Sequence, residues 1–385
     1  MNAVPLGPPH AAPRPRLVWR LRLALMLIGL AALLALLIAL AALAIPAPAL
    51  AAGAADLIER GHWKEARALL EPEVEAHPGD AAAICELSQV RMAYRDVDGA
   101  LRLAEKAVAL DPKNARAHEQ LAMVVGEKAS HAGALHQIGL ARRFKREADA
   151  AVALDPGRLD AQWGLMLFYW KAPGIVGGDK NKARAQADRI AALDAARGEL
   201  ARARLAIEGH DTTAALAHWR KAVELGPQDY EARVTLASQL AARNDWEGAE
   251  QQALEAKRID SGRSSAYALL AAADAHAGRW NDLDPLLDAA REAVPGNLSA
   301  YYQAARTLIV DGREFPRAER YLRAYLGGEP ENGSPPLAAA HWRLAQALEK
   351  QGRKAEAIAE LETALKARPD FEDAKKDLKR LKKQA

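Results

Sequence analysis

Apolar residues recur along most of the chain at intervals of three and four positions, the spacing of one face of an α-helix. Leu87, Val90, Tyr94 and Val97 illustrate it, with gaps of three, four and three positions. Ala and Leu are abundant whereas Val and Ile are scarce, a composition that favours helices over strands. The pattern therefore predicts an all-α protein built from amphipathic helices.

A longer period is superimposed on this helical pattern. At nine places a small or apolar residue is followed twelve positions later by Pro, or in two of the nine by Ala or Ser. These pairs are Ala66/Pro78, Ala100/Pro112, Phe144/Pro156, Ala183/Ala195, Ala215/Pro227, Ala249/Ser261, Leu283/Pro295, Ala318/Pro330 and Ala357/Pro369. Alanine also lies seven positions into six of these intervals, at Ala107, Ala151, Ala222, Ala256, Ala290 and Ala364. The basal spacing of 34 residues between the interval ends, as from Pro78 to Pro112, predicts a two-helix repeat. Proline would end each second helix, and the alanines would mark close helix contacts.

The stretch "GRKAEAIAELETALKARPDF", which begins at Gly352, resembles a tetratricopeptide repeat, and the resemblance extends over about residues 52–369. It implies a right-handed superhelical α-solenoid of about nine helix pairs, in which the first helices line a concave groove and stacking forms a continuous core. Residues 370–385 read as a basic capping helix. Insertions are expected near 126–143, 172–179 and 331–337.

Residues 1–51 have a separate pattern. They contain four arginines and no acidic residue, and all four arginines precede an uninterrupted apolar run from Leu23 to Ile45. Ala49-Leu50-Ala51, after this run, fits a signal-peptidase site. The run is also long enough to span a bilayer. A cleaved signal peptide and a retained inner-membrane anchor both remain open. In either case the positive-inside rule places the body in the periplasm.

Charge and cysteine content narrow the function classes. The formal net charge is +3, but the four arginines of residues 1–51 account for more than this excess, so the remainder is close to neutral. A nucleic-acid partner is not expected, because it requires a concentrated basic face. Cys85 is the sole cysteine, which rules out an intramolecular disulfide and favours a buried apolar role.

The segment "APGIVGGDKNKA", from Ala172 to Ala183, resembles a phosphate-binding loop at first sight. It lacks the G-x-x-x-x-G-K-[ST] spacing and follows a predicted helix rather than a strand. The segment is better interpreted as a long turn with Asp179 as the N-cap of the next helix. Gly177, Gly178 and Lys180 remain a candidate anion site at that helix N-terminus.

No catalytic or cofactor motif is evident. The histidines do not form a metal-binding helical pair, and no G-x-S-x-G motif occurs. We therefore expect no enzyme activity, no metal and no cofactor.

The phase of the repeats predicts which side chains face the groove. Aromatic and arginine side chains in such a groove are typical binding hot spots. The predicted partner-binding residues are Arg116, Glu119, Met123, Trp163, Leu167, Trp170, Lys171, Tyr302, Arg306, Trp342 and Gln346.

These features together predict a non-catalytic scaffold or adaptor of the bacterial cell envelope that binds a protein or peptide segment in the groove. Two alternatives remain: a repeat protein that binds a small ligand or glycan, and a holdase-type assembly factor for exported proteins.

Overall fold

The computed structural model describes residues 47–383. The chain divides into two compact units at Ala52/Gly53, and only residues 47–52 of the first unit are described. The predicted apolar segment Leu23–Ile45 thus lies outside the described residues. Within 47–383, no helix is both long and apolar enough to cross a membrane.

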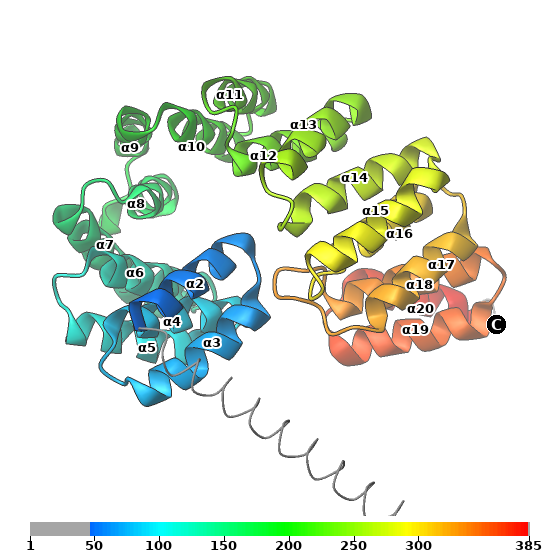
Figure 1. Cartoon of the computed structure of the whole chain (residues 1–385), viewed down its shortest axis with the longest axis horizontal. Coiled ribbons are helices and arrows are strands. Elements are labelled where there is room, and N and C mark those ends of the chain that lie inside the picture. Colours follow the sequence, from blue (N-terminus) through cyan, green and yellow to red (C-terminus); the bar gives the residue numbers. More distant parts are fainter. Residues whose placement is uncertain (1–46, 384–385) are drawn as a thin grey trace, which may run out of the picture. The chain divides into compact units, whose positions relative to one another are not determined.

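Residues 47–383 form the α-helices α2 to α20 and one short 3-10 helix, with no strand among them. The helices follow one another as nine pairs and a final single helix (Figure 1). The first four pairs are α2 (Ala47–Arg60) and α3 (Trp63–Ala76), α4 (Ala81–Ala93) and α5 (Val97–Leu110), α6 (Ala115–Ser130) and α7 (Ala134–Leu154), and α8 (Leu159–Lys171) and α9 (Lys180–Leu193). The next five are α10 (Ala195–Glu208) and α11 (Thr212–Leu225), α12 (Tyr230–Ala241) and α13 (Trp246–Ile259), α14 (Ser264–Ala277) and α15 (Trp280–Ala293), α16 (Ser299–Val310) and α17 (Phe315–Leu326), and α18 (Leu337–Lys350) and α19 (Lys354–Ala367). The predicted all-α solenoid of about nine pairs is confirmed.

From α4 onward each first helix packs against its own second helix, and several first helices also contact the first helix of the next pair, as α4 does with α6 and α14 with α16. The alanines of the period lie at these contacts. Ala66, Ala107, Ala222 and Ala364, for example, are fully buried. A larger side chain at such a position would push the paired helices apart.

Aspartate begins many of the helices. The carboxylates of Asp80, Asp96, Asp211 and Asp245 each accept a hydrogen bond from a backbone N–H in the first turn of the following helix. Such caps satisfy donors that the helix itself leaves unpaired.

The expected insertions differ in structure. The extra residues near 126–143 lengthen α6 and α7, which have 16 and 21 residues, more than the 14 of α5. The other two insertions form irregular connections, one between α8 and α9 and one between α17 and α18.

The array ends in α20 (Glu372–Lys383), the expected capping helix. Ala374 and Leu381 of α20 are buried in the core that also contains the side chains of α16 to α19. Its polar face carries Lys375, Lys376, Lys379, Lys382 and Lys383.

Candidate partner-binding hollow

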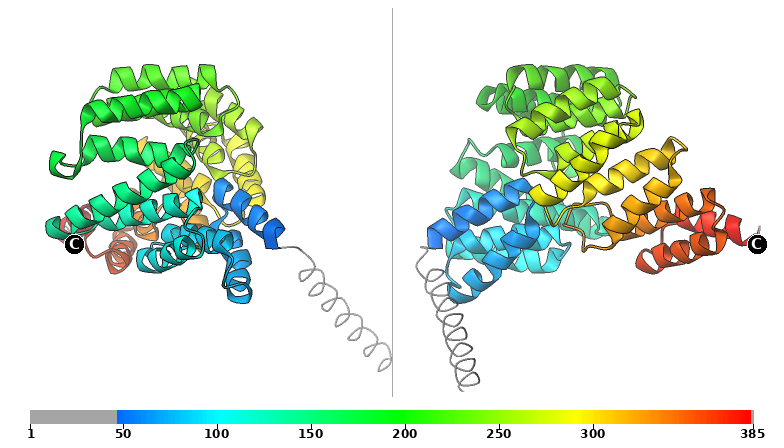
Figure 2. Two further views of the ribbon diagram at one scale, coloured as in Figure 1. Left: turned by 90° about the vertical axis from the view of Figure 1, so that its left-hand side faces the viewer. Right: turned by 45° about the vertical axis from the view of Figure 1, so that its right-hand side comes forward.

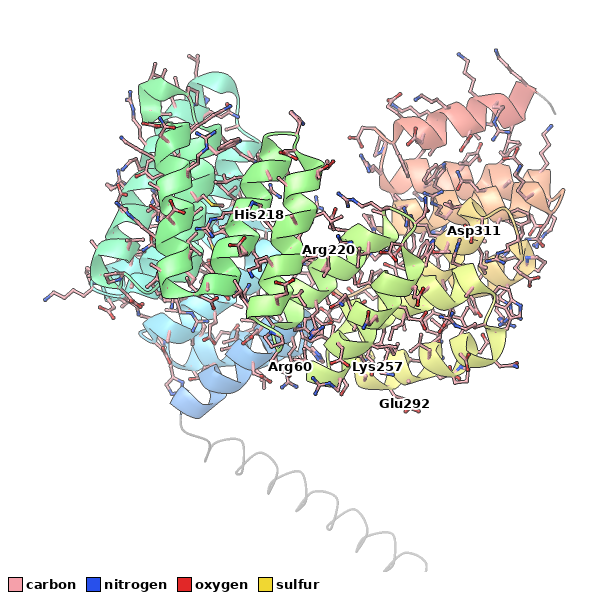
Figure 3. All side chains as sticks on the ribbon, turned by 90° about the horizontal axis from the view of Figure 1, so that it is seen from above. Arg60, His218, Arg220, Lys257, Glu292 and Asp311 are labelled. Atoms are coloured by element: carbon pink, nitrogen blue, oxygen red, sulfur yellow. The ribbon has the colours of Figure 1, made fainter. Side chains whose placement is uncertain are left out.

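The larger of the two hollows described below, about 1680 Å³ in volume, is lined by the first helices α12, α14 and α16 and by several turns and connections. Small polar and apolar side chains dominate its wall, including Ser238, Ser265, Ala268, Gln303 and Val310. Asp311, labelled in Figure 3, also lines it. First helices thus line this hollow, as the repeat phase predicts.

The connection between α17 and α18 forms another wall of this hollow. Residues 329–336 all line it, together with Tyr94 and Arg95 from the turn after α4. Segments far apart in the sequence therefore line one space. The two further views in Figure 2 show the helix pairs stacked in chain order. The repeat phase did not predict this part of the wall, because the sequence of an irregular connection has no periodic pattern.

A clasp, formed by residues 60–64 with residues 260–262 and 329–331, joins the first pair to later pairs. His62 Nε2 lies 2.7 Å from the carbonyl oxygen of Gly262, and Arg60 Nε lies 3.6 Å from an oxygen of Asp260. The Lys64 N–H donates to Glu331 Oε1 at 3.0 Å, and Lys64 Nζ donates to the carbonyl of Glu329. Glu331 is only 4% exposed, and burial raises the pKa of its carboxyl.

The smaller hollow, about 850 Å³, lies where the N-terminal ends of α6, α8, α10, α12 and α14 approach α2. Its wall consists largely of charged side chains, and many of them form ion pairs within the chain. Arg116 Nη1 lies 3.0 Å from buried Glu86, and Arg197 Nε lies 3.4 Å from Asp229. These pairs connect successive repeats, so the predicted groove residue Arg116 has a partner within the chain.

Two helices that lack a capping side chain of their own are capped by the preceding first helix. Arg158 and Arg263 occupy the N-cap positions of α8 and α14 without capping them. Instead, Glu119 Oε2 accepts from the Ala161 N–H at 3.2 Å, and the Tyr230 hydroxyl oxygen accepts from the Ala266 N–H at 3.1 Å. Glu119 is 4% exposed and also pairs with Arg158. This predicted groove residue therefore has a structural role between repeats, which its sequence position did not reveal.

Met123, the third predicted residue of α6, is 42% exposed and lines neither hollow. The predicted residues of α8 are largely engaged in packing. Trp163, Leu167 and Trp170 are partly buried against the core formed with α9 and α10, while Lys171 Nζ lies 3.0 Å from Glu208. None of these four lines either hollow.

The four predicted residues of α16 and α18 have different surroundings. Tyr302 is buried beside Tyr325, whereas Arg306 is exposed in the larger hollow. Trp342 packs edge-on against Phe371, and its Nε1 donates to Asp377 of α20 at 2.9 Å. Gln346 accepts from Arg343 at 2.9 Å. Of all the predicted groove residues, Arg306 alone lines the larger hollow, because packing between pairs takes up most of the others.

The glycine-rich connection is a closed turn. It contains the 3-10 helix η1 (Gly174–Val176), and Gly177 has φ 104°, a conformation that favours glycine. The N–H groups of Gly177 and Gly178 donate to the carbonyls of Gly174 and Pro173. Gly178 has no room for a Cβ, which would lie against the carbonyl of Ala172. The turn geometry thus accounts for these glycines.

Asp179 caps α9, as predicted, by accepting from the N–H groups of Asn181 and Lys182. Lys180 Nζ lies 4.9 Å from the centre of the Trp170 ring. The donors proposed for an anion therefore have partners within the chain, and the anion site stays a prediction.

The thiol of Cys85 and possible metal ligands are the remaining reactive groups to consider. Cys85 is buried, as predicted, and burial raises the pKa of its thiol to about 12, so the thiol is protonated at neutral pH. Among residues 47–383, no group of His, Cys, Asp and Glu side chains is arranged to hold a metal ion.

Comparisons with known proteins agree with this architecture. Residues 200–264 and 302–372 match the family model described as tetratricopeptide repeat, and residues 81–170 match the one described as Regulator of microtubule dynamics protein 1-3. No curated protein matches the chain.

Two solved structures are similar to the chain. TTC0263, a tetratricopeptide repeat protein of Thermus thermophilus, has 22% identity and a TM-score of 0.45, covering 51% of this chain and 100% of its own. Yeast Tom70 has 14% identity and a TM-score of 0.44, covering 88% of each chain. The family match, the repeat period and the stacked helix pairs show that this chain belongs to the tetratricopeptide repeat proteins.

Proposed function

We propose that this protein is a non-catalytic adaptor of the bacterial cell envelope, which binds a segment of a partner protein in the larger hollow. The observation that carries the proposal is the wall of that hollow, built from three successive first helices and an irregular connection. Stacked repeats commonly present extended binding surfaces of this kind.

Size and chemistry favour a peptide segment over a small ligand. At about 1680 Å³ the hollow exceeds the roughly 300–1,000 Å³ that is usual for small-molecule sites. Its wall mixes hydroxyl and amide groups with exposed apolar groups such as Val310, which is 65% exposed. Such a wall suits the alternating main-chain and side-chain groups of a peptide.

The similarity of residues 81–170 to a microtubule-dynamics family does not determine the partner. Of that segment, only Tyr94 and Arg95 line the larger hollow. The envelope location rests on the pattern of residues 1–51 alone. Alkaline phosphatase fused after residue 51 would test it, because this enzyme is active only after export; an inactive fusion would argue against an envelope protein.

Site-specific photo-cross-linking would test the hollow itself. A photoreactive residue at Val310 in the full chain should cross-link one discrete partner in cells. Leu254 on α13 is the matched control, because it is apolar and 51% exposed but lines neither hollow. The same partner at both positions, or none at Val310, would contradict the proposal. Many unrelated proteins at Val310 alone would favour a holdase.

A further inference from the structure

The clasp and the larger hollow are built from the same two parts of the chain. On one side lie the first two pairs, which supply Lys64 to the clasp and the turn residues Tyr94 and Arg95 to the wall of the hollow. On the other side lies the connection between α17 and α18, which supplies Glu331 to both the clasp and the wall. The distance between these two parts of the wall therefore depends on the clasp.

The clasp residue and the wall residues of the first two pairs belong to one packed unit. The side chain of Tyr94 packs against the core that contains Ala66 and Leu70 of α3. The guanidinium of Arg67, also on α3, lies 4.9 Å from the centre of the Tyr94 ring. Close-packed side chains transmit a displacement to one another, so a shift of Lys64 at the start of α3 would carry Tyr94 with it.

The connection between α17 and α18 is fixed at two points. Near its end, the hydroxyl of Tyr325, a fully buried residue of α17, donates to the carbonyl of Pro335. Near its start, Glu331 accepts from the Lys64 N–H and lies against Gly296, where a Cβ atom would be only 2.5 Å from Glu331 Oε2. Of these contacts, opening of the clasp would break the bond to Lys64.

Few bonds hold the clasp closed. Among residues 47–383, extensive helix packing joins only helices of the same pair or of neighbouring pairs. The clasp adds the hydrogen bonds of His62 and Lys64 and the partly exposed ion pair of Arg60. Each such interaction is weak by itself. The clasp can therefore open while the helix pairs remain intact.

We propose that closure of the clasp makes the larger hollow competent to bind, and that a partner segment in contact with both parts of the wall holds the clasp closed. This inference rests on the proposed function and adds a conformational step to it. A ligand that binds the closed state more tightly shifts the equilibrium toward closure, and closure raises the affinity for the ligand by the same factor. Residues 60–64 do not line the hollow, so they influence the partner only through closure.

Photo-cross-linking from Val310 in the full chain, combined with the double variant Lys64→Pro/His62→Ala, tests this inference. Proline removes the N–H that donates to Glu331 and is tolerated in the first turn of a helix, where Lys64 lies. His62→Ala removes the bond to the carbonyl of Gly262, and the His62 side chain makes no capping bond to α3. Loss of both bonds should shift the clasp about tenfold toward the open state. The yield of cross-linked partner should fall with it.

Asn281→Pro is the matched control. Asn281 is the second residue of α15 and follows Trp280, as Lys64 is the second residue of α3 and follows Trp63. It is exposed, lies outside the clasp and lines neither hollow. Hydrogen exchange at residues 62–66 reports opening of the clasp, and unchanged exchange in α10 and α11 shows that the fold persists.

Three outcomes would overturn the coupling. Undiminished cross-linking in the double variant, despite faster exchange at residues 62–66, would overturn it and leave partner binding in the hollow intact. Exchange there that is no faster would show that these bonds do not hold the clasp, and an equal loss of cross-linking in Asn281→Pro would show that the effect is not specific to it. Absence of any discrete partner at Val310 in the wild type would overturn the proposed function and the coupling together.

Discussion

The backbone N–H of Lys64 donates a hydrogen bond of 3.0 Å to Oε1 of Glu331, across 267 positions of the chain. Repeat proteins are usually stabilised by contacts between neighbouring repeats alone. Here the start of α3 in the first pair is bonded to the connection before the ninth. The same connection forms a wall of the larger hollow, so the clasp and the candidate binding site share residues 329–331.

Removal of the Glu331 side chain should loosen the clasp. In Glu331→Ala the N–H groups of Lys64 and Asn332 lose their acceptor, which typically costs about 1–3 kcal/mol. We expect faster hydrogen exchange at residues 62–66 and 329–334, with exchange in α10 and α11 unchanged. Glu329→Ala is the control, because it keeps the backbone carbonyl that accepts from Lys64 and removes only an exposed ion pair of 3.6 Å with Lys64, worth about 1 kcal/mol or less. Unchanged exchange in Glu331→Ala would show that this bond does not hold the clasp closed.

The clasp should also depend on pH. Burial raises the pKa of Glu331, so the closed clasp favours the protonated carboxyl. The stabilisation that this protonated carboxyl gives to the closed clasp is complete below the ordinary Glu pKa of about 4.3. It is lost as the pH rises through the raised pKa. Lys64, His62, Tyr94 and Glu329 are the other titratable groups around it.

Glu331→Gln should remove this dependence, since an amide oxygen still accepts from Lys64 and does not titrate. The free energy of clasp opening, measured by hydrogen exchange, should fall with rising pH in the wild type relative to Glu331→Gln. Each unit of the pKa difference corresponds to about 1.4 kcal/mol. If the wild-type clasp became stronger relative to the variant as the pH rises, the predicted direction of this pH dependence would be wrong.

Glu119 should matter more for stability than an ordinary ion-paired glutamate. Glu119→Ala leaves the Ala161 N–H and the Arg158 guanidinium without their acceptor, and we expect a loss of about 2–4 kcal/mol in the repeats around α8. Glu105→Ala is the control, because Glu105 makes a partly exposed ion pair with Arg143 and should cost less than about 1 kcal/mol. Denaturant unfolding measures both; equal losses would contradict the capping role.

Trp342 should act on the capping helix rather than on a partner. Trp342→Ala removes the contacts with Phe371 and Asp377, and because Trp342 is only partly buried we expect a loss below the roughly 3–5 kcal/mol typical of fully buried aromatic residues. We expect faster exchange in α20. Asp377→Ala keeps the contact of Trp342 with Phe371, removes the hydrogen bond from Trp342 and a partly exposed ion pair with Arg380, and should cost less. Weaker partner binding by Trp342→Ala, with α20 exchange unchanged, would instead support the groove role predicted from the sequence.

The repeating architecture could be predicted from the sequence alone. Local signals carry this information: the three-and-four spacing fixes the buried face of each helix, alanines such as Ala107 permit close contact, and Pro and Asp mark helix ends. Because each repeat contacts mainly its neighbours, local signals suffice to specify the stack. The turn at Gly177, with Asp179 as its cap, was predictable for the same reason.

Tertiary structure alone decided which first-helix residues are available to a partner. The repeat phase placed Glu119, Trp342 and Arg306 on first helices alike, but Glu119 caps the next repeat, Trp342 holds α20, and Arg306 remains exposed in the hollow. The clasp at Glu331 was not predicted. It depends on residues that meet across most of the chain, and such distant contacts leave no periodic pattern in the sequence.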